Sequence, residues 1–375
     1  MRHAIIVSIA FALTAGCEPD QDRSDLFGSS PPAPVDAASG SHHDAGADAS
    51  PDGGIICSPG LTACGSTCVD LQTDASNCGD CGRQCGGTAC TAGMCGTTVL
   101  AQGQAYPSAV AVDSQYVYWV NDSNSSAGGV RKIDKMQLGA APIVLASGQG
   151  NPTDLVIDAT SVYWVNATDG AVLTVPLLGG PTTQLAVNQD SPSHLALASG
   201  NLFWTDSGSQ GLGSVMKKSI AGGAPTALLD SPSPDRIAAN GDTVFYSDRD
   251  GLYSYSAHEW RTISTGGIMS IAADGSHVYW STTSGIFRAA TPDGAPEMIH
   301  DTASMALAID GTHLYFVEYH VTPTISWDIR RLPLAGGAPL TLASGQVQPA
   351  GLALDDHFLY WVNSTATGAV VRVGK

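Results

Sequence analysis

The segment that decides the fold is Asn151–Asp190, which reads NPTDLVIDATSVYWVNATDGAVLTVPLLGGPTTQLAVNQD. It contains short apolar runs, rich in Val, Leu, Tyr and Trp, at Leu155–Ile157, Val162–Val165, Ala171–Pro176 and Thr182–Ala186. Runs this short, bounded by Gly, Asp, Asn and Pro, predict strands joined by hairpins. A single four-stranded meander buries too little apolar surface to be stable alone, so it requires neighbouring copies of itself.

The same unit recurs throughout residues 97–375, where an aromatic pair marks each second strand. Successive pairs are roughly 34 to 45 residues apart, which is the spacing of propeller blades. The pairs are Tyr118-Trp119, Tyr163-Trp164, Phe203-Trp204, Phe245-Tyr246, Tyr279-Trp280, Tyr315-Phe316 and Tyr360-Trp361. We expect these rings to form the core between sheets, and the Asp that follows many first strands to cap a turn rather than bind calcium. The fold class is therefore all-β, a seven-bladed β-propeller.

The seventh unit stops after its third strand, at Lys375. The missing fourth strand is predicted at the other end of the repeats, because Thr97–Gln104 (TTVLAQGQ) resembles Leu340–Gln346 (LTLASGQ). Pairing of this N-terminal strand with the last unit closes the ring and removes exposed strand edges.

The repeats also resemble a known class. Phe203-Trp-Thr-Asp206, and Tyr-Trp-Val-Asn beginning at residues 118, 163 and 360, are similar to YWTD propeller repeats, with some NHL-like character. YWTD propellers usually have six blades, so seven units depart from that family. The resemblance therefore implies the fold and no inherited function.

The N-terminus has the features of an export signal. Arg2 precedes the apolar run Ala4–Ala15, which is too short to remain in a bilayer as a spanning helix. The run leads into Leu13-Thr14-Ala15-Gly16-Cys17, which resembles a bacterial lipobox, although Thr14 stands where Leu is usual. The resemblance implies cleavage of residues 1–16 and acylation of Cys17. The alternative is an ordinary secretory signal with a chance Cys.

Residues 17–55 are predicted to be a disordered linker, because Ala, Ser, Pro, Gly and Asp cannot bury enough surface to order the chain. Glu18 follows the anchored Cys, where Asp would resemble an inner-membrane retention signal. We therefore expect the outer membrane or the cell surface as the location, or otherwise secretion.

Residues 56–96 are predicted to form a separate cysteine-rich module. Eight cysteines in so short an exported segment indicate a disulfide framework, with zinc binding as the alternative and the pairing left open. They are Cys57, Cys64, Cys68, Cys78, Cys81, Cys85, Cys90 and Cys95. The sequence around Asn77-Cys-Gly-Asp-Cys81-Gly-Arg-Gln-Cys85 looks like the Stig1-type repeat, and this resemblance implies an extracellular spacer or adhesion unit.

The formal net charge of −18 argues against nucleic-acid binding, which needs a basic face. We find no serine nucleophile elbow, HExxH, paired CxxC or phosphate-binding Gly loop. We expect no cofactor, no metal and a monomer.

Departures from the repeat are the best guide to a site. We align the units on their first-strand Pro and compare the residue two positions later. Four of the seven units have a small residue there, namely Ala, Ser, Ala or Gly. Units 2, 3 and 4 instead have Asp154, His194 and Arg236. These side chains are predicted to line one mouth of the axial channel, where they would bind a ligand or set up a base beside an anion site. The alternative is that Asp154 and Arg236 pair and fill the channel.

The long loop of unit 6, Glu318–Ser326, carries Tyr319 and leads to Trp327. Aromatic residues on a variable loop favour a contact surface, while the alternative is that Trp327 packs along its own blade. These features together predict a cell-envelope lipoprotein whose propeller binds a protein or small ligand. A lyase- or hydrolase-type enzyme and a purely structural protein are the alternatives.

Overall fold

The computed structural model describes residues 48–49, 55–122, 128–208, 210–321 and 325–375. The predicted signal segment, Cys17 and most of the predicted linker lie outside these residues. The chain divides into two compact units, whose boundary falls between Asp70 and Leu71, inside the cysteine-rich segment. We describe each unit by itself. Among the described residues, no helix has the length and apolar character to cross a bilayer.

The larger unit contains seven four-stranded antiparallel sheets. Blade 1 consists of β8 (Pro107–Val112), β9 (Tyr116–Asn121), β10 (Gly128–Asp134) and β11 (Ile143–Gln149). Blade 2 consists of β12 (Pro152–Ile157), β13 (Ser161–Asn166), β14 (Ala171–Pro176) and β15 (Thr183–Ala186). Blade 3 consists of β16 (Pro192–Ala198), β17 (Asn201–Asp206), β18 (Gly213–Ser219) and β19 (Thr226–Ser231). Blades 4 and 5 consist of β20 (Ile237–Asn240), β21 (Thr243–Ser247), β22 (Gly251–Ser256) and β23 (Glu259–Thr265); and β24 (Ser270–Ala273), β25 (His277–Ser281), β26 (Ile286–Ala290) and β27 (Glu297–His300). Blades 6 and 7 consist of β28 (Ser304–Ile309), β29 (His313–His320), β30 (Ser326–Pro333) and β31 (Leu340–Gln346); and β32 (Pro349–Leu354), β33 (Phe358–Asn363), β34 (Gly368–Gly374) and β7 (Thr98–Gln104).

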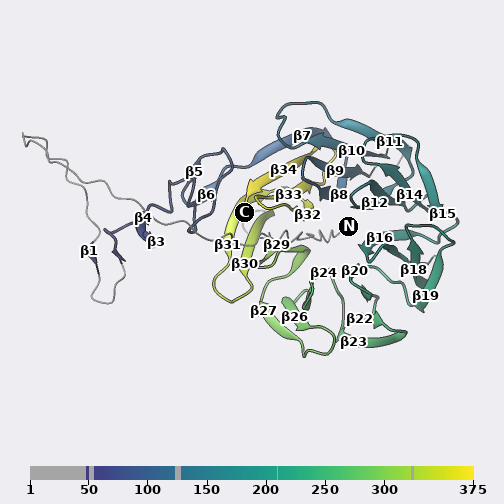
Figure 1. Ribbon diagram of the computed structural model, residues 1–375. Helices are drawn as coiled ribbons and strands as arrows, with labels where there is room; N and C mark the ends of the chain where they lie inside the picture. The colour runs from purple at the N-terminus through teal and green to yellow at the C-terminus, as the bar shows by residue number, and fades with distance from the viewer. Residues whose placement is uncertain (1–47, 50–54, 123–127, 209, 322–324) are drawn as a thin grey trace, which may run out of the picture. The chain divides into compact units, whose positions relative to one another are not determined.

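The seven-bladed propeller and its closure are thus confirmed. The sheets form a ring in which the first strand of each blade lies innermost (Figure 1). Consecutive first strands contact one another, and β32 contacts β8, which completes the circle. The last sheet has the order β32-β33-β34-β7, with Val370 opposite Ala101 and Val371 opposite Val99.

The aromatic pairs form the core, as predicted. The tryptophans at 119, 164, 204, 280 and 361 are completely buried. The repeated Asp acts as a turn residue: Asp158 accepts the backbone N–H groups of Thr160 and Ser161 and the Tyr163 hydroxyl at 2.7–2.8 Å. Blades 3 and 4 lack this Asp, and both have Phe in place of the Tyr. The turn and the first aromatic ring therefore change together.

A second repeated contact joins neighbouring blades. The indole N–H of Trp164 donates to Oε1 of Gln149 at 3.0 Å, and Gln149 ends the fourth strand of the preceding blade. The same contact recurs fifteen residues apart in three other pairs, namely Trp119–Gln104, Trp204–Gln189 and Trp361–Gln346. At the junction of blades 4 and 5, the equivalent residue is Thr265, and the buried Nε1 of Trp280 has no hydrogen-bond partner.

All eight predicted cysteines are disulfide-bonded, which confirms the framework. In the smaller unit, β1 (Asp48–Ala49) pairs with β2 (Ile55–Ile56), β3 (Thr62–Cys64) pairs with β4 (Thr67–Val69), and Cys57 is bonded to Cys68. In the larger unit, which adds β5 (Cys90–Thr91) and β6 (Met94–Cys95), Cys78 is bonded to Cys90 and Cys85 to Cys95.

The segment from Leu71 to Gly96 packs on blades 6 and 7. Its cysteines belong to the same apolar cluster as Trp361 and Val371. The buried Arg83 donates two hydrogen bonds to the carbonyl of Gly374, and further ones to the carbonyls of Cys78 and Gly93. This segment therefore holds the end of β34 in place, beside the strand that closes the ring.

Candidate functional site

A polar cavity of about 480 Å³ opens where blades 2, 3 and 4 meet. It is formed by residues at the start of the first strands and by residues that directly follow the second strands. Its lining residues are Asn151, Thr153, Ala167, Thr168, Ser191, Pro192, Ser193, His194, Ser207, Gly208, Asp235 and Arg236. His194 and Arg236 from the predicted site therefore meet in one cavity.

The wall of the cavity contains a strained backbone position that also occurs in blades 1, 4 and 7, at Tyr106, Ser233 and Gln348. Asn151 and Ser191, each directly before a first-strand Pro, adopt left-handed conformations with φ of 59° and 62°. Their carbonyls accept the N–H groups of Ala167 and Ser207, respectively, which ties each entry loop to the loop that leaves the second strand. Non-glycine residues in this region cost roughly 1–3 kcal/mol, so the rest of the blade must hold the wall in this shape.

The charged centre consists of Arg236, His194 and Asp235. Nη1 of Arg236 lies 2.6 Å from Nε2 of His194, and Asp235 lies 3.3 Å from both Nδ1 of His194 and Nε of Arg236. His194 and Arg236 are 7% exposed, whereas the Asp235 side chain is 50% exposed. Burial lowers the pKa of Arg236, against the opposing effect of the nearby Asp235 and Asp154 carboxylates.

This geometry fixes the histidine tautomer. Because a guanidinium can only donate, Nε2 of His194 must be the acceptor, and Nδ1 carries the proton toward Asp235 and the Ser193 hydroxyl. The Nε2 lone pair is consequently occupied by Arg236. His194 thus serves to orient the guanidinium, and it is not placed to remove a proton from a ligand in this arrangement.

Asp154 lies away from this cavity. It is fully buried, and it accepts the N–H of Leu155 and the N–H of Leu195 in blade 3, both at 2.8 Å. Burial raises its pKa well above the ordinary value. These two hydrogen bonds hold the Asp154 carboxylate against the first strand of blade 3.

The hydroxyl groups of the cavity form an ordered chain. Ser207 donates to Ser193 at 3.3 Å, Ser193 lies 2.9 Å from Thr205, and Thr205 donates to the carbonyl of Asp235 at 2.8 Å. Thr153 donates to the carbonyl of Ser193 at 2.8 Å. The hydroxyl protons are therefore engaged within the protein, and lone pairs of Ser207 and Thr153 are left on the cavity wall.

Asp206 ends β17, next to Ser207 and Gly208 of the cavity wall. Blades 1, 2 and 7 have Asn at this position, and in blade 2 Asn166 donates to Gln149 Oε1 at 3.1 Å. An ionised carboxylate cannot donate this hydrogen bond. The buried Oδ1 of Asp206, like that of Asn166, has no hydrogen-bond partner among the described residues. Burial raises the pKa of Asp206 to about 6, opposed by hydrogen bonds from Asp190 and Trp204.

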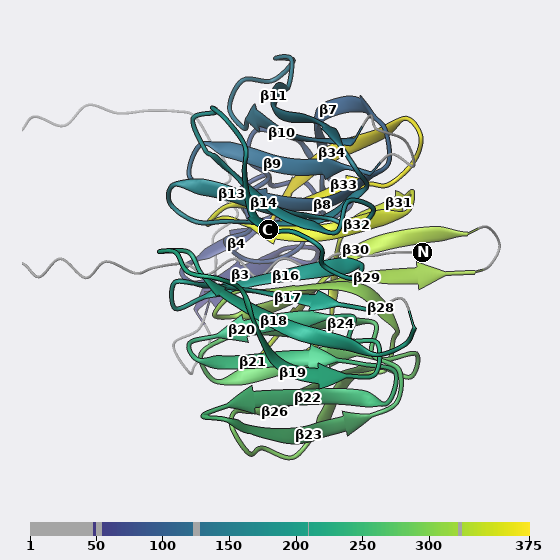
Figure 2. The same ribbon diagram turned by 90° about the vertical axis from the view of Figure 1, so that its right-hand side faces the viewer.

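Tyr319 and Trp327 do not line the cavity. They are paired across the long β29–β30 hairpin of blade 6, with ring centroids 5.4 Å apart. Figure 2 shows this hairpin extending beyond the neighbouring strands. Tyr319 is 42% exposed, whereas Trp327 is half-buried against the cluster between blades 6 and 7. In this hairpin Trp327 packs along its own blade, whereas Tyr319 is exposed on the other strand. The loop tip at residues 322–324 lies outside the described residues.

Sequence reasoning missed Asp235 and the hydroxyl chain. Asp235 directly precedes Arg236, and Ser193 directly precedes His194, so both were within one residue of a predicted position. The repeat alignment could have found Asp235, because the same place in blade 1 holds Ser108, but not Ser193, because blade 1 has a Ser there as well.

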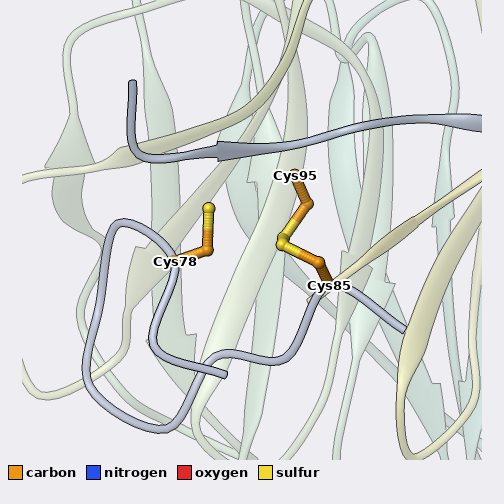
Figure 3. Close-up of side chains that lie close together, drawn as sticks. All are labelled: Cys78, Cys85 and Cys95. Atoms are coloured by element: carbon orange, nitrogen blue, oxygen red, sulfur yellow. A yellow bond between two sulfur atoms is a disulfide. The ribbon is translucent and has the colours of Figure 1, made fainter. Parts of the chain in front are cut away.

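Within the described part of the chain, one group of residues has metal-ligand spacing, namely Cys78, Cys85 and Cys95 (Figure 3). Their sulfur atoms lie within 4.8 Å of one another, but Cys85 is bonded to Cys95 and Cys78 to Cys90. Disulfide sulfurs are not the thiolates that bind zinc, so this group is a pair of adjacent disulfides.

Comparison with known proteins agrees with this architecture. A model of the stigma-specific STIG1-like protein family matches residues 47–98. No curated protein matches the chain. A streptogramin B lyase structure is similar with a TM-score of 0.59 and 11% identity, over 74% of this chain and 97% of that chain. A computationally designed protein, Ika8, gives a TM-score of 0.53 and 13% identity, over 73% and 98%. At these identities the structural likeness concerns the fold alone.

Proposed function

We propose that the propeller is a binding module for a small polar ligand, with its site in the cavity between blades 2, 3 and 4. The observation that carries this proposal is the buried Arg236 guanidinium, positioned by His194 and Asp235 at a hollow whose lining includes several hydroxyl groups. A few convergent polar groups in a preformed cavity are the usual basis of ligand specificity.

Binding is favoured over acid–base catalysis because Nε2 of His194 is already engaged by Arg236. A lyase or hydrolase role, the alternative from the sequence, requires a ligand that draws Arg236 away and frees this nitrogen. The streptogramin B lyase shares the propeller architecture, and its activity is not an argument about this cavity.

The test is a thermal-shift screen of small acids, sugars and amino acids on the purified chain and on Arg236→Met. Arg261→Met is the matched control, because Arg261 lies on the exposed outer strand of blade 4. We expect stabilising compounds to act on the wild type and on the control, and to lose their effect on Arg236→Met. Equal stabilisation of all three proteins would place binding elsewhere.

We further propose that the protein is exported and held at the cell envelope by acyl chains on Cys17, as the lipobox-like segment suggests. The cysteine-rich segment and its disulfides suit an oxidising compartment. In a bacterial host, Cys17→Ser should move the protein from the membrane fraction to the soluble fraction. Retention of the variant in the membrane fraction would exclude the acyl anchor.

A further inference from the structure

The cavity has one accessible cationic contact. Of the guanidinium nitrogens of Arg236, Nη1 lies against His194 and Nε faces Asp235, whereas Nη2 has no hydrogen-bond partner among the described residues and is not among the buried unpartnered atoms. The half-exposed Asp235 sits beside it. A group with one negative charge can therefore be bound at Nη2, while a dianion would be repelled by the neighbouring carboxylate.

The opposite wall offers hydrogen-bond acceptors to a ligand. Because the protons of Ser207 and Thr153 are used within the protein, these oxygens can accept hydrogen bonds from a ligand but do not readily donate to it. The hydroxyls of Thr168 and Ser191 also line the cavity and can donate or accept. A ligand with an anionic acceptor at one end and several hydroxyl groups at the other therefore matches both walls.

The remaining lining excludes other acids. Among the described residues, the apolar ones that line the cavity are Ala167, Pro192 and Gly208, and none is aromatic or a large aliphatic residue. An aromatic or fatty acid would find no apolar surface to cover. The volume of about 480 Å³ is toward the lower end of ligand pockets, which run from roughly 300 to 1,000 Å³.

From these contacts we infer that the ligand class is a hydroxylated monocarboxylate, that is, a sugar acid or a similar polyhydroxy acid. The carboxylate contacts Nη2 of Arg236, and the hydroxyl groups donate to Ser207 and Thr153. This inference rests on the proposed function, because it specifies the ligand of the same cavity.

The experiment is calorimetric titration of the full chain with glucuronate, and with glucose, acetate, serine and inorganic phosphate as comparison probes. We expect glucuronate to bind at least tenfold more tightly than glucose, which lacks the carboxylate, and than acetate, which lacks the hydroxyl donors. Arg236→Met should abolish glucuronate binding. Ser207→Ala should weaken glucuronate several-fold and leave acetate unchanged.

Each other result is decisive. Equal binding of glucose and glucuronate overturns the anionic contact, and tighter binding of serine or phosphate assigns a zwitterionic or phosphorylated class instead. If no probe binds, the sugar-acid class is wrong. The proposed function is then tested separately by the thermal-shift screen, in which Arg236→Met is compared with Arg261→Met.

Discussion

Four junctions of the ring differ from the other three in how the blades are joined. At the junctions 6/7, 7/1, 1/2 and 2/3, a Gln at the end of one blade accepts a hydrogen bond from the buried Trp of the next. At 3/4 the equivalent pair is Ser231 and Tyr246, and Ser231 bonds to Asp248 instead. At 4/5 the indole N–H of Trp280 is unpaired.

The difference shows that aromatic packing alone can join two blades, and that the Gln adds hydrogen bonding to a contact that already exists. The candidate cavity spans junction 2/3, which has a Gln–Trp pair, and junction 3/4, which has none. The repeat thus departs from its pattern where the polar site is built.

The largest effect is expected from the closing strand. Replacing Thr98–Gln104 with a Gly-Ser sequence of equal length removes the β7–β34 pairing, the buried Leu100 and the Gln104–Trp119 contact. At about 1 kcal/mol for each net hydrogen bond, plus the lost burial, we expect a loss on the order of 5 kcal/mol or more. Thermal denaturation by circular dichroism measures it, and an unchanged midpoint would contradict the closure.

Asp206→Asn restores the residue found in blades 1, 2 and 7 and should remove a pH dependence. The folded-state pKa of about 6 is above the unfolded value of about 3.9, so the folded state keeps a proton that the unfolded state releases. Stability should fall as the pH rises from about 4 to 6 and remain low above it. At pH 7.5 the variant should be more stable than the wild type by about 3 kcal/mol, measured by urea titrations at several pH values. A wild-type stability that is flat across this window would refute the unusual ionisation.

Gln149→Met gives junction 1/2 the unpaired Trp of junction 4/5. It leaves the Trp164 indole and the Asn166 amide without their common acceptor. A buried unsatisfied donor costs about 1–3 kcal/mol, and urea denaturation should show a loss in this range. Gln137→Met, on the exposed 3–4 hairpin of blade 1, is the control and should be neutral. Equal effects of the two substitutions would mean that the Gln contact contributes nothing.

The smallest effect is expected from the reverse change, Thr265→Gln. Thr265 is paired with Gly251, as Gln149 is paired with Gly128, so a Gln there reaches the position from which Trp280 is contacted. One added hydrogen bond should stabilise the protein by about 1 kcal/mol. The same substitution in a Trp280→Phe background should give no gain, and a gain there would show that the indole is not the partner.

The fold was predictable because its signals are local. Tyr163-Trp164 and the Gly- and Asp-rich turns mark strands within a few residues, and the likeness of Thr97–Gln104 to Leu340–Gln346 reveals the closing strand. Gln149 was not recognised, because its partner belongs to the next blade, although the constant spacing of fifteen residues to the Trp was present in the sequence.

The site was harder to predict for a geometric reason. The alignment assumed that equivalent positions point in the same direction, and this placed His194 and Arg236 together as the structure does. Asp154 stays outside the cavity, because its carboxylate accepts the N–H groups of Leu155 and Leu195, and residue type alone does not indicate these contacts. Asp235 lies in the loop before β20, where strand alternation gives no direction.

The closing strand finally has a consequence for the order in which the protein is made. Residues 98–104 leave the ribosome before every other strand of the ring, yet their partner, Gly368–Gly374, is synthesised last. Blade 7 therefore cannot be completed until β34 has been synthesised, and the contact of Arg83 with the Gly374 carbonyl forms no earlier. The other six blades are synthesised while the ring is still open.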